Sequence, residues 1–206
     1  MANWLLAPVW PLAIFSSEKA FSKNPLLRSE RLNRRGLHAF RVALAARLAE
    51  RRRRKLAHLV TAEEREAFAR DGAIVKQPLS DDAFQKVRDE VMAVRAPAYE
   101  MREGDAITRR IAVTPEILKS CPALKALLTS KEYQGPIRYV GSFDTAPYLY
   151  IQTIYTHVNG DTNAPDPQND LHMDTFHSTV KAWLWLDDVD EAMGPFAYVF
   201  GSHKVD

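Results

Sequence analysis

The sequence has one cysteine and lacks an apolar run long enough to cross a membrane as a helix. A single cysteine, Cys121, excludes a disulfide within the chain and fits a reducing compartment. The apolar stretch at residues 4–15 is interrupted by Pro8 and Pro11, and it is shorter than the roughly 20 residues that a spanning helix needs. No positive charge precedes that stretch and no clear small-residue cleavage site follows it, so a signal peptide is not expected. We therefore expect a cytoplasmic protein.

Charge of either sign is unevenly distributed. Residues 1–60 hold 13 Lys/Arg against 3 Asp/Glu, a net charge of +10, whereas residues 61–206 hold 15 against 23, a net charge of −8. This division predicts a basic N-terminal extension, residues 1–60, ahead of an acidic main domain, residues 61–206. A basic segment of this kind suits an anionic surface such as membrane phospholipid or nucleic acid.

The extension contains a helical pattern at residues 36–60. Its apolar positions recur at helical spacing with arginines between them: Leu37, Phe40, Leu44 and Leu48. We expect this helix to pack on the main domain and to keep a solvated basic face. Peripheral contact with a membrane surface is the alternative, since Trp4 and Trp10 lie nearby in sequence. Nucleic-acid binding is not expected, because aromatic and basic residues do not alternate and no binding motif is present.

Helix signals precede most strand signals in the main domain. Helices are predicted over about 61–70, 80–94 and, in two short pieces that begin at prolines, 115–128. Strand formers occur at 73–75, 148–155, 180–186 and 196–200, with a polar loop at 159–170 and a turn at 191–195. Residues 96–110 show no regular pattern. This order predicts an α+β fold in which helices lead into an all-β core.

The tripeptide His172-Met173-Asp174 is the central chemical signal. In an extended chain, residues i and i+2 point to the same face, so the imidazole of His172 and the carboxylate of Asp174 would converge. Two histidines and one carboxylate form the triad that holds Fe(II) and leaves positions open for a cosubstrate and dioxygen. A zinc hydrolase site is a weaker alternative, because nothing supplies the other ligands that such sites take. For a bare tripeptide, a surface histidine and aspartate would be the simpler interpretation.

The sequence around this tripeptide resembles the phytanoyl-CoA dioxygenase family of iron- and 2-oxoglutarate-dependent oxygenases. Four pieces carry the resemblance in order: H-M-D at 172–174, an apolar strand with a tryptophan that ends in L-D-D-V at 186–189, G-P-F at 194–196 and G-S-H-K at 201–204. The stretches E-A-F-A-R-D-G-A-I-V-K and L-S-D-D-A-F resemble the opening helix-strand-helix of the family. The resemblance therefore covers about residues 61–206.

The resemblance implies a double-stranded β-helix, a jelly roll of about eight strands. It also implies Fe(II) as the cofactor, with 2-oxoglutarate and O2 as cosubstrates, and a small organic substrate that is hydroxylated while 2-oxoglutarate is decarboxylated. His172 and Asp174 match two iron ligands of the family, and Trp183 matches a residue that lines the cosubstrate pocket. Gln152 and Lys181 are expected to face the same pocket.

The other histidines of the main domain are His157, His177 and His203. His177 is a candidate substrate contact, with simple exposure beside the strand as the equal alternative, and His157 is interpreted as structural or solvated. In the family, the distal histidine ligand and the arginine that binds 2-oxoglutarate follow the G-S-H-K piece. His203 is therefore predicted to cap a turn rather than to bind iron, and no catalytic residue is assigned.

These observations leave two interpretations of function. The first is a dioxygenase whose jelly roll is incomplete at its C-terminal side and which is inactive as given, because the distal histidine and the arginine are missing. The second is a non-catalytic or degenerate relative that serves as a binding or membrane-associated module.

Overall fold

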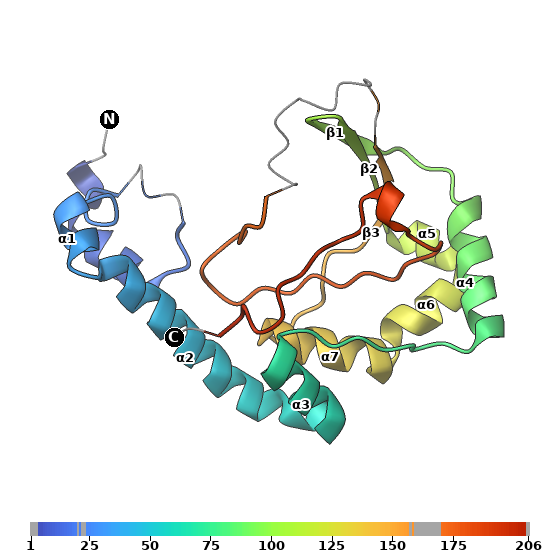
Figure 1. Cartoon of the computed structure of the whole chain (residues 1–206), viewed down its shortest axis with the longest axis horizontal. Helices are drawn as coiled ribbons and strands as arrows, with labels where there is room; N and C mark the ends of the chain where they lie inside the picture. The colour runs from blue at the N-terminus through green and yellow to red at the C-terminus, as the bar shows by residue number, and fades with distance from the viewer. Residues whose placement is uncertain (1–3, 20, 22–23, 157, 159–169, 205–206) are drawn as a thin grey trace.

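A computed structural model describes residues 4–19, 21, 24–156, 158 and 170–204 of the chain. Figure 1 shows an elongated N-terminal helical arm that lies against one end of a body of helices and a small sheet. The predicted α+β class is confirmed, since the helices are accompanied by one three-stranded antiparallel sheet among the described residues. In those same residues, no helix is long and apolar enough to cross a membrane.

The N-terminal extension is helical, and its long helix is the one that the sequence predicts. Its elements are η1 (Trp4–Phe15), α1 (Glu30–Arg34), α2 (Leu37–Leu56) and η3 (Ala57–Leu59). The face of α2 that packs does not coincide with the predicted apolar pattern, because Arg41 and Ala49 are buried whereas Phe40 and Leu48 of that pattern are exposed. The arginines of the extension therefore include residues that face the body.

Four helices of the body begin at the signals found in the sequence. They are α3 (Ala62–Asp71), α4 (Asp81–Ala93), α5 (Pro115–Ser120) and α6 (Pro122–Thr129). Thr61 and Glu64 form a full capping box at the start of α3, and Ser80 caps α4. Proline occupies the first turn of α5 and α6, where its missing N–H costs nothing.

Helix α7 (Lys131–Gly141) was not predicted. Ser130 caps it, but Gly135 and Pro136 lie in its interior, and adjacent glycine and proline usually indicate a turn. Gly135 is buried, and its missing side chain leaves room for the carbonyl oxygen of Leu59 in η3. The helix is therefore adapted to close contact with the end of the extension.

The sheet consists of β1 (Tyr99–Glu103), β2 (Ala106–Ala112) and β3 (Tyr150–Tyr155), antiparallel and in that order. β3 confirms the strand predicted at 148–155. The β1–β2 hairpin shows that the prediction of irregular structure at 96–110 was wrong. Gly104 has a φ of 55° in the two-residue Gly-Asp loop between the strands, which is a known hairpin signal.

The strands predicted at 73–75, 180–186 and 196–200 are not paired, and no full jelly roll is seen among the described residues. The last two segments run side by side (Figure 1), since the ring centroids of Trp183 and Phe196 are 4.5 Å apart. No backbone–backbone hydrogen bond between described residues involves 171–189. Strand propensity produced extended chain there, but a sheet also requires a partner in register. The turn predicted at 191–195 is present as η5 (Glu191–Met193).

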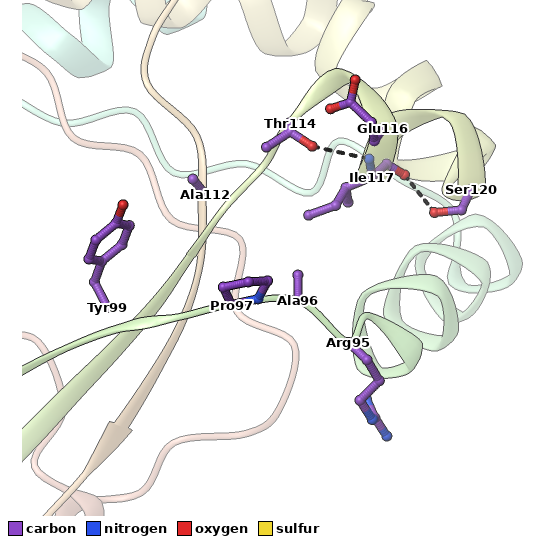
Figure 2. A pocket seen from close by; sticks show the side chains of 9 residues that line it. All are labelled: Arg95, Ala96, Pro97, Tyr99, Ala112, Thr114, Glu116, Ile117 and Ser120. Carbon is purple, nitrogen blue, oxygen red and sulfur yellow. Dashed lines mark hydrogen bonds between the residues drawn. The ribbon is translucent and has the colours of Figure 1, made fainter.

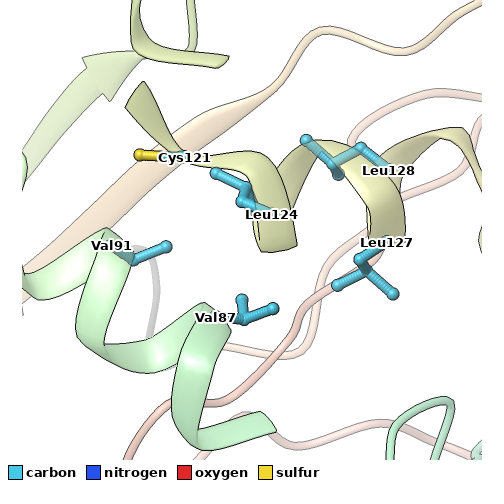
Figure 3. Close-up of a cluster of buried hydrophobic side chains, with 6 residues drawn as sticks. All are labelled: Val87, Val91, Cys121, Leu124, Leu127 and Leu128. Atoms are coloured by element: carbon cyan, nitrogen blue, oxygen red, sulfur yellow. The ribbon is translucent and has the colours of Figure 1, made fainter. Parts of the chain in front are cut away.

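The main core lies between α4 and α6. Figure 3 shows side chains of α4 facing those at the start and along one side of α6: Val87, Val91, Cys121, Leu124, Leu127 and Leu128. Both carboxylate oxygens of Glu90 accept N–H groups at the start of α6, from Ala123 and Leu124, at 2.9 Å. Glu90 thereby caps α6 from a different helix and fixes the angle between the two.

Candidate functional site

The predicted ligand pair lies on a segment without regular secondary structure, and both side chains are about half exposed. The Nε2 atom of His172 is 3.7 Å from Oδ1 of Asp174, so the two side chains converge as their spacing suggests. Two donors that bind one metal at right angles, each about 2.1 Å from it, would be about 3 Å apart. A small adjustment of these side chains would therefore bring both within reach of one ion.

The ring of His172 is oriented by the backbone. Its Nδ1 atom is 2.7 Å from the carbonyl oxygen of Asp170, and a carbonyl oxygen can only accept, so Nδ1 carries a proton. In the neutral ring, the lone pair of Nε2 then faces the carboxylate of Asp174. Two electron-rich atoms in this arrangement favour a cation between them, and backbone orientation of the ring is typical of histidine ligands.

Lys181 forms an ion pair with Oδ2 of Asp174. The hydrogen bond from Lys181 lowers the pKa of the Asp174 carboxyl, although burial acts in the opposite direction. Asp174 is therefore an ionised carboxylate with one oxygen toward His172 and the other toward an ammonium group. Lys181 thus shares a partner with the candidate metal ligand.

Gln152 and Trp183 make their contacts elsewhere. Gln152 on β3 accepts a hydrogen bond from Nε of Arg110 on β2 at 2.8 Å. Trp183 stacks on Trp185 with ring centroids 6.4 Å apart, and it also contacts Phe196. Within the described part of the chain, no hydrogen bond or ring contact links either residue to His172 or Asp174. Their assignment to a cosubstrate pocket stays a prediction.

His177 and His203 occupy different surroundings. His177 is half-buried, its ring edge contacts Phe176, and its Nδ1 is 3.4 Å from the carbonyl oxygen of Ser178. The ring of His203 lies 5.2 Å from that of Phe68 in α3, in the turn that the sequence predicts at 201–204. Burial lowers the pKa of the His203 imidazole. His157 and residues 159–169 of the predicted loop lie outside the described residues.

Among the hollows that the described residues form are two that neither His172 nor Asp174 lines. Figure 2 shows one of about 520 Å³ beside Pro97, Tyr99 and Ile117, where Thr114 caps α5. The other, of about 640 Å³, lies between α4 and residues 183–188 and includes Trp183. The ligand pair is therefore placed on the surface rather than in either hollow.

The segment that carries the pair is held by side chains that the sequence analysis did not single out. Nη2 of Arg53 donates to Oγ of Ser178 at 3.0 Å, and the guanidinium of Arg41 lies 4.5 Å from the ring centroid of Phe176. Both arginines belong to α2. The alanines that share their side of the helix, such as Ala49, could have indicated a face that permits close approach, but the basic composition indicated solvent instead.

An imidazole and a carboxylate correspond to two of the three ligand types of an iron triad. Among the described residues, no group of three or more histidine, cysteine, aspartate or glutamate side chains is arranged to hold a metal. The chemistry of an imidazole and a carboxylate nevertheless fits Fe(II). A family model described as phytanoyl-CoA dioxygenase (PhyH) matches residues 68–206, about two thirds of the chain.

The chain belongs to the phytanoyl-CoA dioxygenase family. It is therefore an Fe(II)/2-oxoglutarate dioxygenase-like protein, as the resemblance suggested. The match begins within α3 and includes the sheet and the His172–Asp174 pair, whereas the extension precedes it. No curated protein and no solved structure matches the chain.

Proposed function

We propose that this member of the phytanoyl-CoA dioxygenase family is a non-haem Fe(II)/2-oxoglutarate dioxygenase that hydroxylates a small organic molecule. The observation that carries the proposal is the convergence of His172 Nε2 and Asp174 Oδ1 at 3.7 Å in a chain of this family. These two residues would hold the iron. Bound Fe(II) would supply the activation of O2 that is coupled to decarboxylation of 2-oxoglutarate.

The residues around the pair would orient His172, bind 2-oxoglutarate and contact the substrate. The carbonyl oxygen of Asp170 keeps the proton on Nδ1 of His172 and so leaves Nε2 available as a ligand. Lys181, which pairs with Asp174, would turn its ammonium toward a carboxylate of 2-oxoglutarate once a metal neutralises Asp174. Trp183 and Gln152 would line the cosubstrate pocket, and His177 would contact the substrate.

Metal binding by single variants of the full chain tests this proposal. Titration with Fe(II) under anaerobic conditions, or with Co(II) followed by its absorption, should show binding that His172→Ala and Asp174→Asn weaken at least tenfold. His58→Ala is the matched control, because His58 is also exposed and its Nδ1 is 3.0 Å from a carbonyl oxygen, that of Lys55. Equal affinity in His172→Ala and His58→Ala would rule out the assigned ligand.

Lys181→Met separates the cosubstrate role from the metal role. Removal of the ammonium frees Oδ2 of Asp174, so metal affinity should be unchanged or higher. The affinity of the metal-loaded protein for 2-oxoglutarate should fall about tenfold, since a charge-assisted contact is lost. Unchanged 2-oxoglutarate affinity would remove Lys181 from the cosubstrate site and leave the ligand pair unaffected.

The outer face of α2 favours a second candidate function, peripheral binding to an anionic membrane. Phe40 and Leu48 on this face are 51% and 42% exposed. Arg47, Arg51 and Lys55 are exposed on the same side of the helix at 100° per residue. In the described residues no carboxylate forms an ion pair with these three cations, because Glu50 pairs with Arg53 and Arg54 instead.

An anionic phospholipid surface is the partner that fits this face. Apolar side chains between cations match the interfacial region of such a bilayer, where each cation near the surface contributes about 1 kcal/mol. A second copy of the chain would bring like charges together. The full chain should sediment with phosphatidylserine-containing vesicles but not with phosphatidylcholine vesicles.

Charge reversal locates the binding face. The double variant Arg47→Glu/Arg51→Glu should lose vesicle binding, whereas Lys86→Glu, at an exposed position of α4, should retain it. Sedimentation of the double variant at the wild-type level would exclude this face. Binding of single-stranded nucleic acid in place of vesicles would identify the other class of anionic partner and would also contradict the membrane assignment.

A further inference from the structure

We propose that the N-terminal extension is a positioning part of the candidate metal site, with Arg41 and Arg53 of α2 fixing the segment 172–178. The extension precedes the residues that the family model matches, so this role is a property of this chain rather than of the matched domain. The inference rests on the proposed function for its consequence, because the segment is taken to be the one that binds metal.

The segment depends on side-chain contacts for its position. It belongs to a stretch without regular secondary structure, and no backbone–backbone hydrogen bond between described residues involves 171–189. A chain without a ladder or a helix has many accessible conformations, and fixing each residue in one of them costs conformational entropy. Contacts that order 172–178 would therefore decide how often His172 and Asp174 face one another.

Arg41 provides the first anchor. Its side chain is almost fully buried, with 2% of the residue exposed, and its guanidinium donates to the carbonyl oxygens of Ile14, Ser16 and Glu18. These bonds hold the guanidinium plane 4.5 Å from the centroid of the Phe176 ring, which also meets the edge of His38. Phe176, two residues after Asp174, therefore makes a cation–π contact with a guanidinium group that hydrogen bonds hold in place.

Arg53 provides the second anchor. Its side chain is only 16% exposed, and it donates both to Oγ of Ser178 and to the carbonyl oxygen of Val140 at the end of α7, at 3.0 Å and 3.2 Å. The hydroxyl of Ser178 in turn donates to the carbonyl oxygen of Gly141 at 3.2 Å. Ser178 is therefore clamped between the extension and α7, four residues after Asp174.

The extension also reaches the ligand residue itself. Nζ of Lys19 donates to the backbone carbonyl oxygen of Asp174 at 3.3 Å. The extension therefore contacts the segment at residues 174, 176 and 178. Arg41 and Arg53 touch neither the metal position nor any reacting atom, so they are positioning residues.

Substitutions on the two faces of α2 test this role in the full chain. Arg41→Met and Arg53→Met remove the inner anchors. Arg54→Met makes the same change on the exposed face of α2, and Arg34→Met makes it at an exposed position of α1. Phe176→Leu removes the ring contact and leaves the bonds of Arg41 to the extension in place. We expect Co(II) affinity to fall about tenfold in the three inner variants and to stay within twofold of wild type in the two outer ones.

The readouts distinguish positioning from loss of folding and from failure of the proposed function. Affinity is compared only below the unfolding transition of each variant, with folding checked by circular dichroism. Inner variants that stay folded and bind Co(II) like the outer ones would overturn the inference. If the wild type itself binds no metal, the proposed function fails. Cleavage by chymotrypsin after Phe176 then tests the anchoring alone, and equal rates in Arg53→Met and Arg54→Met would overturn that as well.

Discussion

Replacing Gly135 by alanine tests whether the extension docks on α7 as closely as the structure shows. A Cβ atom at this position would lie 2.1 Å from the carbonyl oxygen of Leu59 and 3.2 Å from its carbonyl carbon. Real Cβ atoms essentially never approach another heavy atom within 3.0 Å. Both neighbours belong to the backbone of η3, so no side-chain rotation relieves the contact, and η3 and α7 must separate by about 1 Å.

Two effects of opposite sign set the magnitude. Alanine is the better helix former by about 1 kcal/mol in a helix interior, which favours the variant. Overpacking in a well-packed region costs about 1–3 kcal/mol, and a contact with backbone lies at the upper end of that range. We therefore expect the free energy of unfolding to fall by about 1–2 kcal/mol. For a chain of this size, that corresponds to a Tm lower by about 2–8 °C.

Thermal unfolding followed by far-UV circular dichroism measures the effect. Gly141→Ala is the control within the same helix, because its Cβ would meet the Cγ1 atom of Val180, a side-chain atom that can move, at 2.9 Å. Its loss of stability should be smaller than that of Gly135→Ala. A Gly135→Ala variant as stable as wild type, or more stable, would show that helix propensity dominates and that the extension is not docked at this distance.

Three further substitutions probe the fold. Glu90→Gln should lower the free energy of unfolding in urea by about 1 kcal/mol, because one of the two accepting oxygens is replaced by an NH2 group, which cannot accept the backbone N–H that it faces. Asp89→Asn, at an exposed position of the same helix, should have little effect. Gly36→Ala should cost about 1 kcal/mol through backbone strain alone, since Gly36 has a φ of 91° and its Cβ would meet nothing within 4 Å; an unchanged Tm would contradict this. Because burial lowers the pKa of His203 below its ordinary value of 6.5, the unfolded chain takes up the proton first, and the stability contributed by the neutral ring is present above pH 6.5 and lost as the pH falls. His203→Gln should therefore flatten the decline of stability between about pH 7 and pH 5, and an equally steep decline would exclude His203 as its source.

Structural features that depend on only a few neighbouring residues could be predicted from the sequence. The capping box of Thr61 and Glu64, the serine cap of α4 and the prolines that open α5 and α6 each involve groups within one helical turn. The convergence of His172 and Asp174 was expected from a rule of the same kind, the two-residue period of an extended chain. The family pattern was likewise contained in the order of short motifs.

The pairing of strands that are distant in the chain could not be predicted from the sequence. The charged residues of β1 and β2 weakened the strand signal of this hairpin, and the glycine turn at Gly104 was its one local indication. Residues 180–186, in contrast, carry strong strand formers and remain unpaired in the described part of the chain. Propensity sets the conformation of a single residue, but a ladder depends on the partner strand. The pair and its family are thus consequences of sequence, while the pairing of strands is a consequence of the fold.

The arginines of α2 show the same division within one helix. By itself, the sequence determined that residues 36–60 are helical and basic, since helical spacing and charge are local properties. Arg41 and Arg53 face the body whereas Arg51 and Arg54 face solvent, although all four have the same side chain. Only the tertiary structure decided which of them hold the segment of His172 and Asp174, because that choice depends on how the helix is rotated against α7 and residues 172–178.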